Sequence, residues 1–179
     1  MEVAMARSIT KYDVLFLCLV LIAIIVNKHV SHLSLPLFLV LVLIGLFFEI
    51  VTRSFWTYSE EFKRSIFVIE NTDVSVAAAF SWAGLLTLCI NVSSLLAKAL
   101  AIPWSELWAS IVVVGVFGNA IETACVRWGM FTYEESWITR MFFFKKSVFL
   151  WDVPVSVRLG YFLNFGPVCA VILHWSKWI

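Results

Sequence analysis

Long, nearly uncharged apolar runs are the feature of this 179-residue chain that most restricts its fold. Of its residues, 62% are hydrophobic and 14% are charged, and the mean hydropathy is +0.96, whereas about half of the residues of a soluble domain are apolar. Inside a bilayer, only helices and closed barrels satisfy every backbone polar group. The runs do not alternate apolar with polar residues, as barrel strands do. The sequence therefore predicts an all-α, polytopic helical membrane protein.

Five apolar segments predict five transmembrane helices. They cover residues 12–28, 34–52, 74–102, 106–127 and 153–176. The first segment is the weakest, because its charge-free core from Val14 to Val26 is shorter than the roughly 20 residues that a span usually needs. The segments leave no room for a separate soluble domain, so we expect residues 1–179 to form a single membrane domain.

The positions of Lys and Arg predict how the chain is oriented. Most of them lie in the amino-terminal segment and in the loops after the second and fourth apolar segments: Arg7, Lys11, Arg53, Lys63, Arg64, Arg127, Arg140, Lys145 and Lys146. Because cytoplasmic loops carry an excess of these residues, we expect the amino terminus and both loops in the cytoplasm and the carboxyl terminus outside. The net charge of +1 says nothing about a nucleic-acid partner, but the chain has no basic stripe, so we expect no such partner.

An ordered series of motifs occurs twice in the chain. The first copy consists of Gly45-Leu46-Phe47-Phe48-Glu49, Trp56, Thr57-Tyr58, Glu60-Glu61 and Asp73-Val74-Ser75-Val76. The second consists of Gly118-Asn119-Ala120-Ile121-Glu122, Trp128, Thr132-Tyr133, Glu134-Glu135 and Asp152-Val153-Pro154-Val155. Two spans separate equivalent points, so we expect a parallel repeat of units 34–102 and 106–176 about an axis near the membrane normal. Residues 1–33 would then be an extra amino-terminal helix.

Two glutamates, Glu49 and Glu122, are the strongest candidates for catalytic residues. Each lies about one turn inside the cytoplasmic end of a predicted helix, and ionisable groups at membrane depth usually face a bundle interior or a wet cavity. Gly45 and Gly118, one turn earlier, would let a helix or a ligand approach closely beside each glutamate. The alternative is a purely structural role, in which Glu49 and Glu122 form ion pairs with Arg53 or Arg127.

Further polar and aromatic residues are expected around these glutamates. Asp73 and Asp152 begin the next helix of each unit and are candidate catalytic carboxylates, with helix capping as the alternative. If the units pack as a pseudo-dimer, all four carboxylates meet at one depth. The predicted substrate-binding residues are Trp56, Tyr58, Trp82, Asn119, Trp128, Tyr133 and Tyr161. Asn119 shares a helix face with Glu122 and is expected to hydrogen-bond to it, and the aromatic residues alternatively form an interfacial belt.

This combination of residues favours acid catalysis on an apolar substrate. Carboxylic acids in apolar surroundings can stay protonated near neutral pH, as a general acid must. Aromatic ring faces stabilise cations through their quadrupole. An acid that protonates a carbon–carbon double bond, with rings around the resulting carbocation, is the chemistry of isoprenoid hydration and cyclisation.

The repeated motifs also resemble those of a known family. The glutamate at a helix end, the aromatic-Thr-Tyr turn and the helix starts VAAAFSWAG (Val76 to Gly84) and DVPVSVRLGYF (Asp152 to Phe162) resemble the membrane carotenoid-biosynthesis family that includes bisanhydrobacterioruberin hydratases. The similarity covers roughly residues 40–167. The chain has Thr52-Arg53-Ser54 where that family's pattern leads us to expect a Thr-Gly turn. The resemblance implies a cofactor-independent hydro-lyase or cyclase that acts on a long isoprenoid.

Two other classes of function remain open from the sequence. One is a non-catalytic membrane module, which would bind a lipid or pigment, form a homo-oligomer or serve as a small subunit of a larger complex. The other is a transporter. The predicted position of the carboxylates argues against transport, because they lie near one membrane face, whereas transporters bind their substrates near the midplane. We expect no metal, because the four cysteines are scattered without a C-x-x-C motif and the histidines have no third ligand nearby. We expect no cofactor, because the sequence has no P-loop and no haem-ligand pair.

Overall fold

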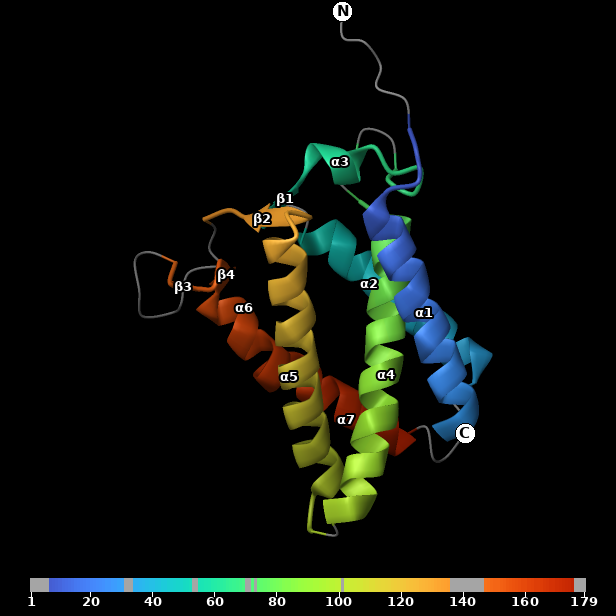
Figure 1. Ribbon diagram of the computed structural model, residues 1–179. Helices are drawn as coiled ribbons and strands as arrows, with labels where there is room; N and C mark the ends of the chain where they lie inside the picture. The colour runs from blue at the N-terminus through green and yellow to red at the C-terminus, as the bar shows by residue number, and fades with distance from the viewer. Residues whose placement is uncertain are drawn as a thin grey trace, which may run out of the picture.

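The computed structural model describes residues 7–30, 34–52, 55–69, 72, 74–100, 102–135 and 147–175. Helices dominate these ranges: α1 (Lys11–Val30), α2 (Leu35–Thr52), α3 (Glu60–Lys63), α4 (Val76–Leu100), α5 (Ser105–Arg127), α6 (Val155–Gly160), the π-helical turn η1 (Tyr161–Phe165) and α7 (Gly166–Trp175). The strands are short: β1 (Trp56–Tyr58), β2 (Phe131–Tyr133), β3 (Phe149–Leu150) and β4 (Val153–Pro154). The connections that carry α3, β1 and β2 lie at the end of the molecule where α1 begins (Figure 1).

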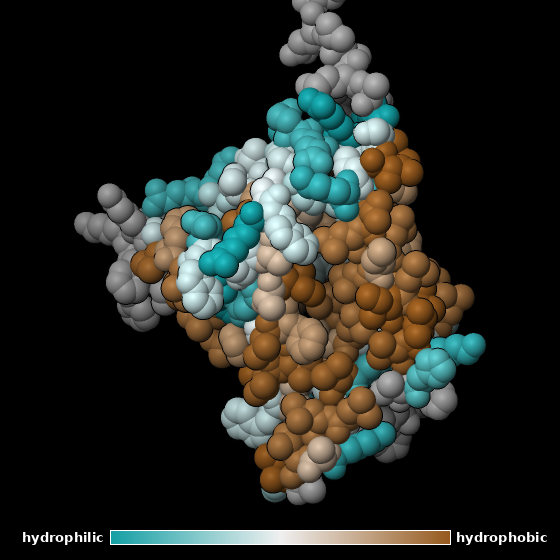
Figure 2. Space-filling view, viewed as in Figure 1, coloured by the Kyte–Doolittle hydropathy of each residue, from teal (hydrophilic) through white to brown (hydrophobic). Residues whose placement is uncertain are grey.

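The helices have the length and composition of a membrane protein. Four helical segments are long and apolar enough to cross a bilayer: Lys11–His29, Val76–Leu100, Ser105–Arg127 and Val155–Trp175. The apolar part of α2, Leu35–Val51, is shorter and lies at the lower limit of about 17 residues for a span. Figure 2 shows apolar side chains in a broad band between polar groups at the two ends of the visible face. The chain is therefore a helical membrane protein.

Helix α4 is the central element of the bundle. α1, α2, α5 and α7 all pack against it, and 67% of its most apolar stretch is buried, compared with 22% for α1. Small residues near its beginning, such as Ala77, Ala83 and Gly84, allow this crowding, because helices in lipid associate by close van der Waals packing. A Cβ added at Gly84 would lie only 3.3 Å from the Cα of Val20 in α1. α1 thus packs directly on the central helix α4.

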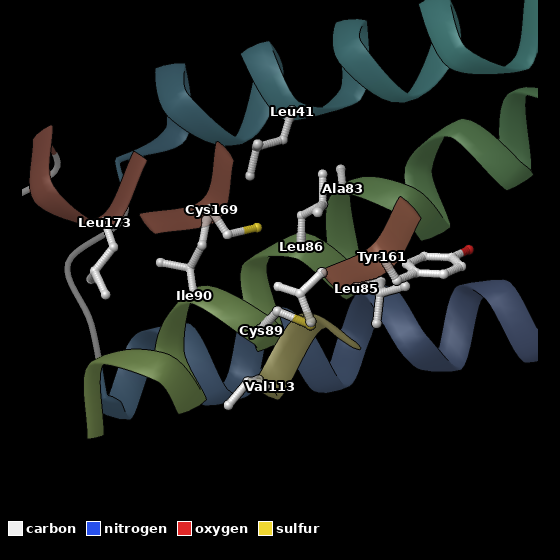
Figure 3. Close-up of a cluster of buried hydrophobic side chains, with 11 residues drawn as sticks. Leu41, Ala83, Leu85, Leu86, Cys89, Ile90, Val113, Tyr161, Cys169 and Leu173 are labelled. Atoms are coloured by element: carbon white, nitrogen blue, oxygen red, sulfur yellow. The ribbon is translucent and has the colours of Figure 1, made fainter. Parts of the chain in front are cut away.

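A buried apolar cluster joins α2, α4 and the carboxyl-terminal helix. Leu41 of α2 and Cys169 of α7 point toward Leu86 and Ile90 of α4 (Figure 3). Tyr161 lies at one end of the cluster, with its hydroxyl directed away from the other members (Figure 3). The cluster therefore supports the part of the chain that carries this phenol.

A capping box fixes the start of α1. The backbone N–H of Thr10 donates to Asp13 Oδ2 at 2.7 Å, and the backbone N–H of Asp13 donates to Thr10 Oγ1 at 3.3 Å. This reciprocal pair satisfies amide groups that the first helical turn leaves without partners. Ser65 Oγ donates to the other carboxylate oxygen, Asp13 Oδ1, at 2.7 Å. The fully buried Asp13 side chain thereby joins α1 to the loop that follows α3.

Strands β1 and β2 replace the two aromatic-Thr-Tyr turns that the sequence predicts. They pair antiparallel, with Thr57 opposite Thr132 and Tyr58 opposite Phe131. The pairing satisfies backbone groups of two loops that lie in different halves of the chain, so neither loop alone indicates a strand. As a result, Tyr58 and Tyr133 are carried over the ends of α2 and α5.

The wide turn η1 interrupts the last long helical segment. Pro167 has no N–H to continue the α-helical hydrogen-bond pattern, and its ring disfavours an undistorted helix before it. The N–H of Gly166 instead donates to the carbonyl oxygen of Tyr161, five residues earlier. Such π-type turns occur frequently at functional sites, and this one begins at a residue of the candidate site.

Candidate functional site

A cavity of about 170 Å³ lies between α1, α4 and α5, next to strands β1 and β2. Both Glu49 and Glu122 line it, and most of the remaining wall is aromatic or aliphatic. The volume is close to that of an engineered apolar cavity of about 150 Å³ that binds benzene. The cavity can therefore hold an apolar group of that size between the two carboxyl groups.

Glu49 is held by donors from β1 and α4. Its side chain is only 2% exposed, and Tyr58 Oη donates a hydrogen bond to Glu49 Oε2 at 2.7 Å. The indole of Trp82 is a second donor. Gly45, one turn earlier, permits this arrangement, because a Cβ there would lie 2.6 Å from the carbonyl oxygen of Ala79. The contact of α2 with α4 thus brings Trp82 to the glutamate.

Glu122 is held in a similar way by donors from β2 and η1. It is 6% exposed. Tyr133 Oη donates to Glu122 Oε1, and Tyr161 Oη donates to Glu122 Oε2 at 2.6 Å. Gly118, one turn earlier, has no side chain to displace the ring of Tyr161, which lies directly against it. Both oxygens of Glu122 are therefore engaged by phenol groups.

The donors of the two glutamates occupy matching positions in the sequence. Tyr58 and Tyr133 both follow the threonine of a short strand. Trp82 and Tyr161 stand at the same offset after the two Asp-Val-x-Val motifs. The rings of Trp82 and Tyr161 stack with centroids 6.2 Å apart and an interplanar angle of 17°. Two similarly built carboxyl sites thus meet at one pair of aromatic rings.

The two sites differ at Arg158, whose role the sequence did not reveal. Its Nη1 donates to Asn119 Oδ1 at 3.2 Å and its Nη2 donates to Thr123 Oγ1 at 2.9 Å. These partners lie on α5 around Glu122, so the guanidinium charge acts on that carboxylate. The matching residue of the first unit is Ala79. A cation therefore stands beside one glutamate, and an apolar side chain occupies the same position in the other unit.

Asn119 does not have the partner that the sequence predicts. Instead of bonding to Glu122, its amide nitrogen donates to the carbonyl oxygens of Gly115, at 2.7 Å, and Arg158, at 3.2 Å. The reason is that the largely buried guanidinium of Arg158 needs acceptors and takes the amide oxygen of Asn119. Asn119 thus positions Arg158 rather than the carboxylate.

The structure also corrects the expected position of Asp152. This residue is exposed in the turn between β3 and β4, with φ at +63°, and it does not line the cavity. The cap of α6 is Pro154, so Asp152 does not cap that helix either. Asp73 and Arg53 lie outside the described residues. Arg127 is exposed, and no ion pair joins it to Glu122 in the described part of the chain.

The remaining predicted aromatic residues lie around the same cavity. Trp56 and Trp128 both line it, and Trp128 is 57% exposed, so it reaches the surface. Tyr12 of α1 donates a hydrogen bond to the carbonyl oxygen of Trp128 at 3.1 Å. α1 also contributes part of the wall, through Leu15 and Phe16, two residues that the sequence did not single out.

The phenol groups from the strands act as hydrogen-bond donors at neutral pH. Burial raises the pKa of Tyr58 and of Tyr133 well above the ordinary value of 10, so both stay protonated. The buried indole N–H of Trp56 lies at hydrogen-bond distance from no acceptor among the described residues. Within those residues, no group of three His, Cys, Asp or Glu side chains is arranged to hold a metal ion.

No protein-family model, no curated protein and no solved structure matches this chain. Its function therefore has to be inferred from the site itself. The chemically active groups of that site are two buried carboxyl groups, their aromatic donors and the apolar cavity between them.

Proposed function

We propose that this protein is an acid catalyst that hydrates or cyclises a long apolar lipid of the isoprenoid type. The observation that carries the proposal is that Glu49 and Glu122, both buried, line one small apolar cavity. A charged or strongly polar substrate would not be matched by such a wall. An alkene is matched by it, and a carboxylic acid is the group that alkene hydration needs.

The proposed reaction requires one acid and one base. The carboxylic acid gives its proton to one carbon of the double bond, whose π electrons form the new C–H bond, and a carbocation and a carboxylate result. In hydration, water adds to the cation and the second carboxylate takes the proton that this water releases. In cyclisation, a second double bond attacks the cation, and a carboxylate removes a proton from the product. The acid is then protonated again by exchange between the carboxyl groups or with water.

The aromatic residues support the cationic step. The stacked rings of Trp82 and Tyr161 lie next to the carboxyl groups, and both line the cavity. Ring faces attract cations, most strongly when water is excluded. Each chemical step thus has a candidate group within the same cavity.

We also propose that the chain crosses the membrane five times, with α2 as the shortest span, and contains the parallel two-helix repeat. The symmetric register of β1 and β2 about Thr57 and Thr132 supports a two-fold axis between the units. A similar backbone bond precedes both second helices: Val76 N–H donates to Phe67 O at 3.0 Å, and Val155 N–H donates to Val148 O at 2.8 Å. The distribution of Lys and Arg favours a cytoplasmic amino terminus.

A non-catalytic lipid-binding module is the second candidate. One observation favours it: phenol groups already occupy both oxygens of Glu122, as expected of a network that only stabilises the fold. In that case the cavity would hold part of a lipid or pigment without changing it. The two functions differ in a measurable way, because only the catalyst transfers a proton to the ligand.

Isotope incorporation tests the proposal. The purified protein in lipid nanodiscs is incubated with an acyclic isoprenoid in deuterated water, and the recovered lipid is analysed by mass spectrometry. We expect deuterium in the product of the wild type, and loss of this product in Glu49→Gln or Glu122→Gln. Asp152→Asn is the matched control, because this exposed carboxylate lies away from the cavity, and it should stay active. Full activity of both glutamine variants, or binding without deuterium uptake, would contradict acid catalysis.

A further inference from the structure

The geometry points to a fixed division of protonation between the two glutamates: Glu122 is ionised, Glu49 carries the proton, and Arg158 enforces the difference. The inference rests on the proposed use of both residues as acid and base, but it concerns where the proton resides before any substrate binds. It follows from one difference in charge between the two carboxyl sites: a cation acts on Glu122, and none among the described residues acts on Glu49.

Arg158 supplies a charge that its direct partners do not balance. Its guanidinium donates to the carbonyl oxygen of Leu150 from Nε at 3.1 Å and from Nη2 at 2.8 Å. Its other partners are the side chains of Asn119 and Thr123. All of these acceptors are neutral, and a guanidinium keeps its charge in proteins. A largely buried cation of this kind is stabilised by a nearby negative charge, and the negative charge that acts on it from α5 is that of Glu122.

The hydrogen bonds of Glu122 agree with an ionised carboxylate. An ionised carboxylate only accepts hydrogen bonds, whereas a protonated one also needs an acceptor for its own O–H group. Tyr133 and Tyr161 each donate to a different oxygen of Glu122. Two phenol donors and a neighbouring guanidinium act against the cost of burying this charge. All of these contacts stabilise the charged form of Glu122.

Glu49 also has hydrogen-bond donors, namely Tyr58, Trp82 and the backbone of Ser75, but it has no neighbouring cation in the described part of the chain. The residue that matches Arg158 in its unit is Ala79, and no described cation forms an ion pair with Glu49. The ionisable groups that act on Glu49 are Tyr58 and Glu122. Two negative charges at one small cavity would repel each other, so one of the two carboxyl groups keeps its proton. The proton stays on the carboxyl group that has no described cation beside it. Glu49 is that group.

The ionisable surroundings of Glu122 are richer. Tyr133, Tyr161 and Arg158 act on it from β2, η1 and α6, and Cys125 lies on its own helix one turn further along. Arg158 is the only cation in this set. For the proposed reaction, Glu49 is thus the acid that protonates the double bond, and Glu122 is the base that receives the proton from water. Arg158 acts as a positioning residue through Glu122.

Infrared spectroscopy of the substrate-free protein in nanodiscs at neutral pH tests this assignment, because a protonated carboxyl group absorbs apart from carboxylates. We expect one such band in the wild type, its loss in Glu49→Gln and its retention in Glu122→Gln. Asp13→Asn is the control for the other fully buried carboxyl group of the described chain, and it should keep the band. A wild type without the band, or a band lost in Glu122→Gln instead, would overturn the assignment.

Arg158 variants test the cause of the difference. Arg158→Gln should add a second band as Glu122 takes up a proton, whereas Arg158→Lys, which keeps the positive charge, should show one band. An unchanged spectrum in a folded Arg158→Gln protein would refute the role of the guanidinium. If this variant does not fold, the comparison of the two glutamate variants still decides where the proton lies. The spectra need no substrate, so the two hypotheses can fail separately. A protein that shows the Glu49 band but transfers no proton to a lipid would refute the proposed reaction and leave the protonation assignment standing.

Discussion

The contact between α2 and α4 at Gly45 leads to a quantitative prediction. A Cβ at this position would stand 2.6 Å from the carbonyl oxygen of Ala79 and 3.0 Å from Trp82 Cβ. The oxygen belongs to the helix backbone, so α4 itself has to move if Gly45 is changed to alanine. Overpacking of this kind costs about 1–3 kcal/mol, and the better helix propensity of alanine offsets up to about 1 kcal/mol of it. Because the clash is with backbone, we take the upper part of this range, about 2–3 kcal/mol, and subtract about 1 kcal/mol for helix propensity. We therefore expect the free energy of unfolding of Gly45→Ala to fall by about 1–2 kcal/mol.

Thermal unfolding in a single detergent measures this difference. A change of 1 kcal/mol corresponds to about 2–4 °C in Tm for a protein of this size, so the Tm of Gly45→Ala should drop by about 2–8 °C. Gly160→Ala is the matched control, because a Cβ there would meet only Asn164 Nδ2, at 3.7 Å. The Tm of this control should stay the same or rise, since alanine is added without a clash.

The two variants together decide whether the reasoning is correct. Separation of α2 from α4 also moves Trp82 away from Glu49, so Gly45→Ala should lower the proposed catalytic activity along with stability. A Tm of Gly45→Ala equal to that of both the wild type and Gly160→Ala would refute the close contact. It would also leave the glycine one turn before Glu49 without a packing role.

Three further predictions concern topology, pH and the cavity. In a cysteine-free background, Lys63→Cys should react with a membrane-impermeant maleimide only after the cells are opened, and Trp104→Cys should react in intact cells; the reverse pattern would contradict the proposed orientation. Burial raises the pKa of Tyr58 and Tyr133, so above about pH 10 these phenols ionise in the unfolded chain but not in the folded one. The free energy of unfolding should therefore be independent of these two residues below about pH 10 and should fall as the pH rises above it. The double variant Tyr58→Phe/Tyr133→Phe should show a shallower decline, and equal slopes would oppose this explanation. Ala78→Leu should fill the cavity and abolish lipid binding without unfolding the protein, whereas unchanged binding would place the ligand elsewhere.

The sequence alone determined where the long apolar helices lie and that the chain is a helical membrane protein. The apolar segment 106–127 corresponds to α5 (Ser105–Arg127), and the segment 153–176 corresponds to the helical run that ends with α7. These features depend on local properties, namely the length of an apolar run and its lack of charge. The two glutamates were also recognisable, because an ionisable residue inside such a run is unusual wherever the chain folds.

Only the tertiary structure decided how the site is built. Arg158 lies beside Glu122 because α6 packs against α5, and it takes the amide of Asn119 that the sequence assigns to the glutamate. Strands β1 and β2 form because two loops meet, and α1 closes the cavity because small residues of α4 let it approach. Periodicity and composition describe neighbours along the chain. The difference between the two glutamates arises from residues far apart in sequence, whose contacts depend on how whole helices pack.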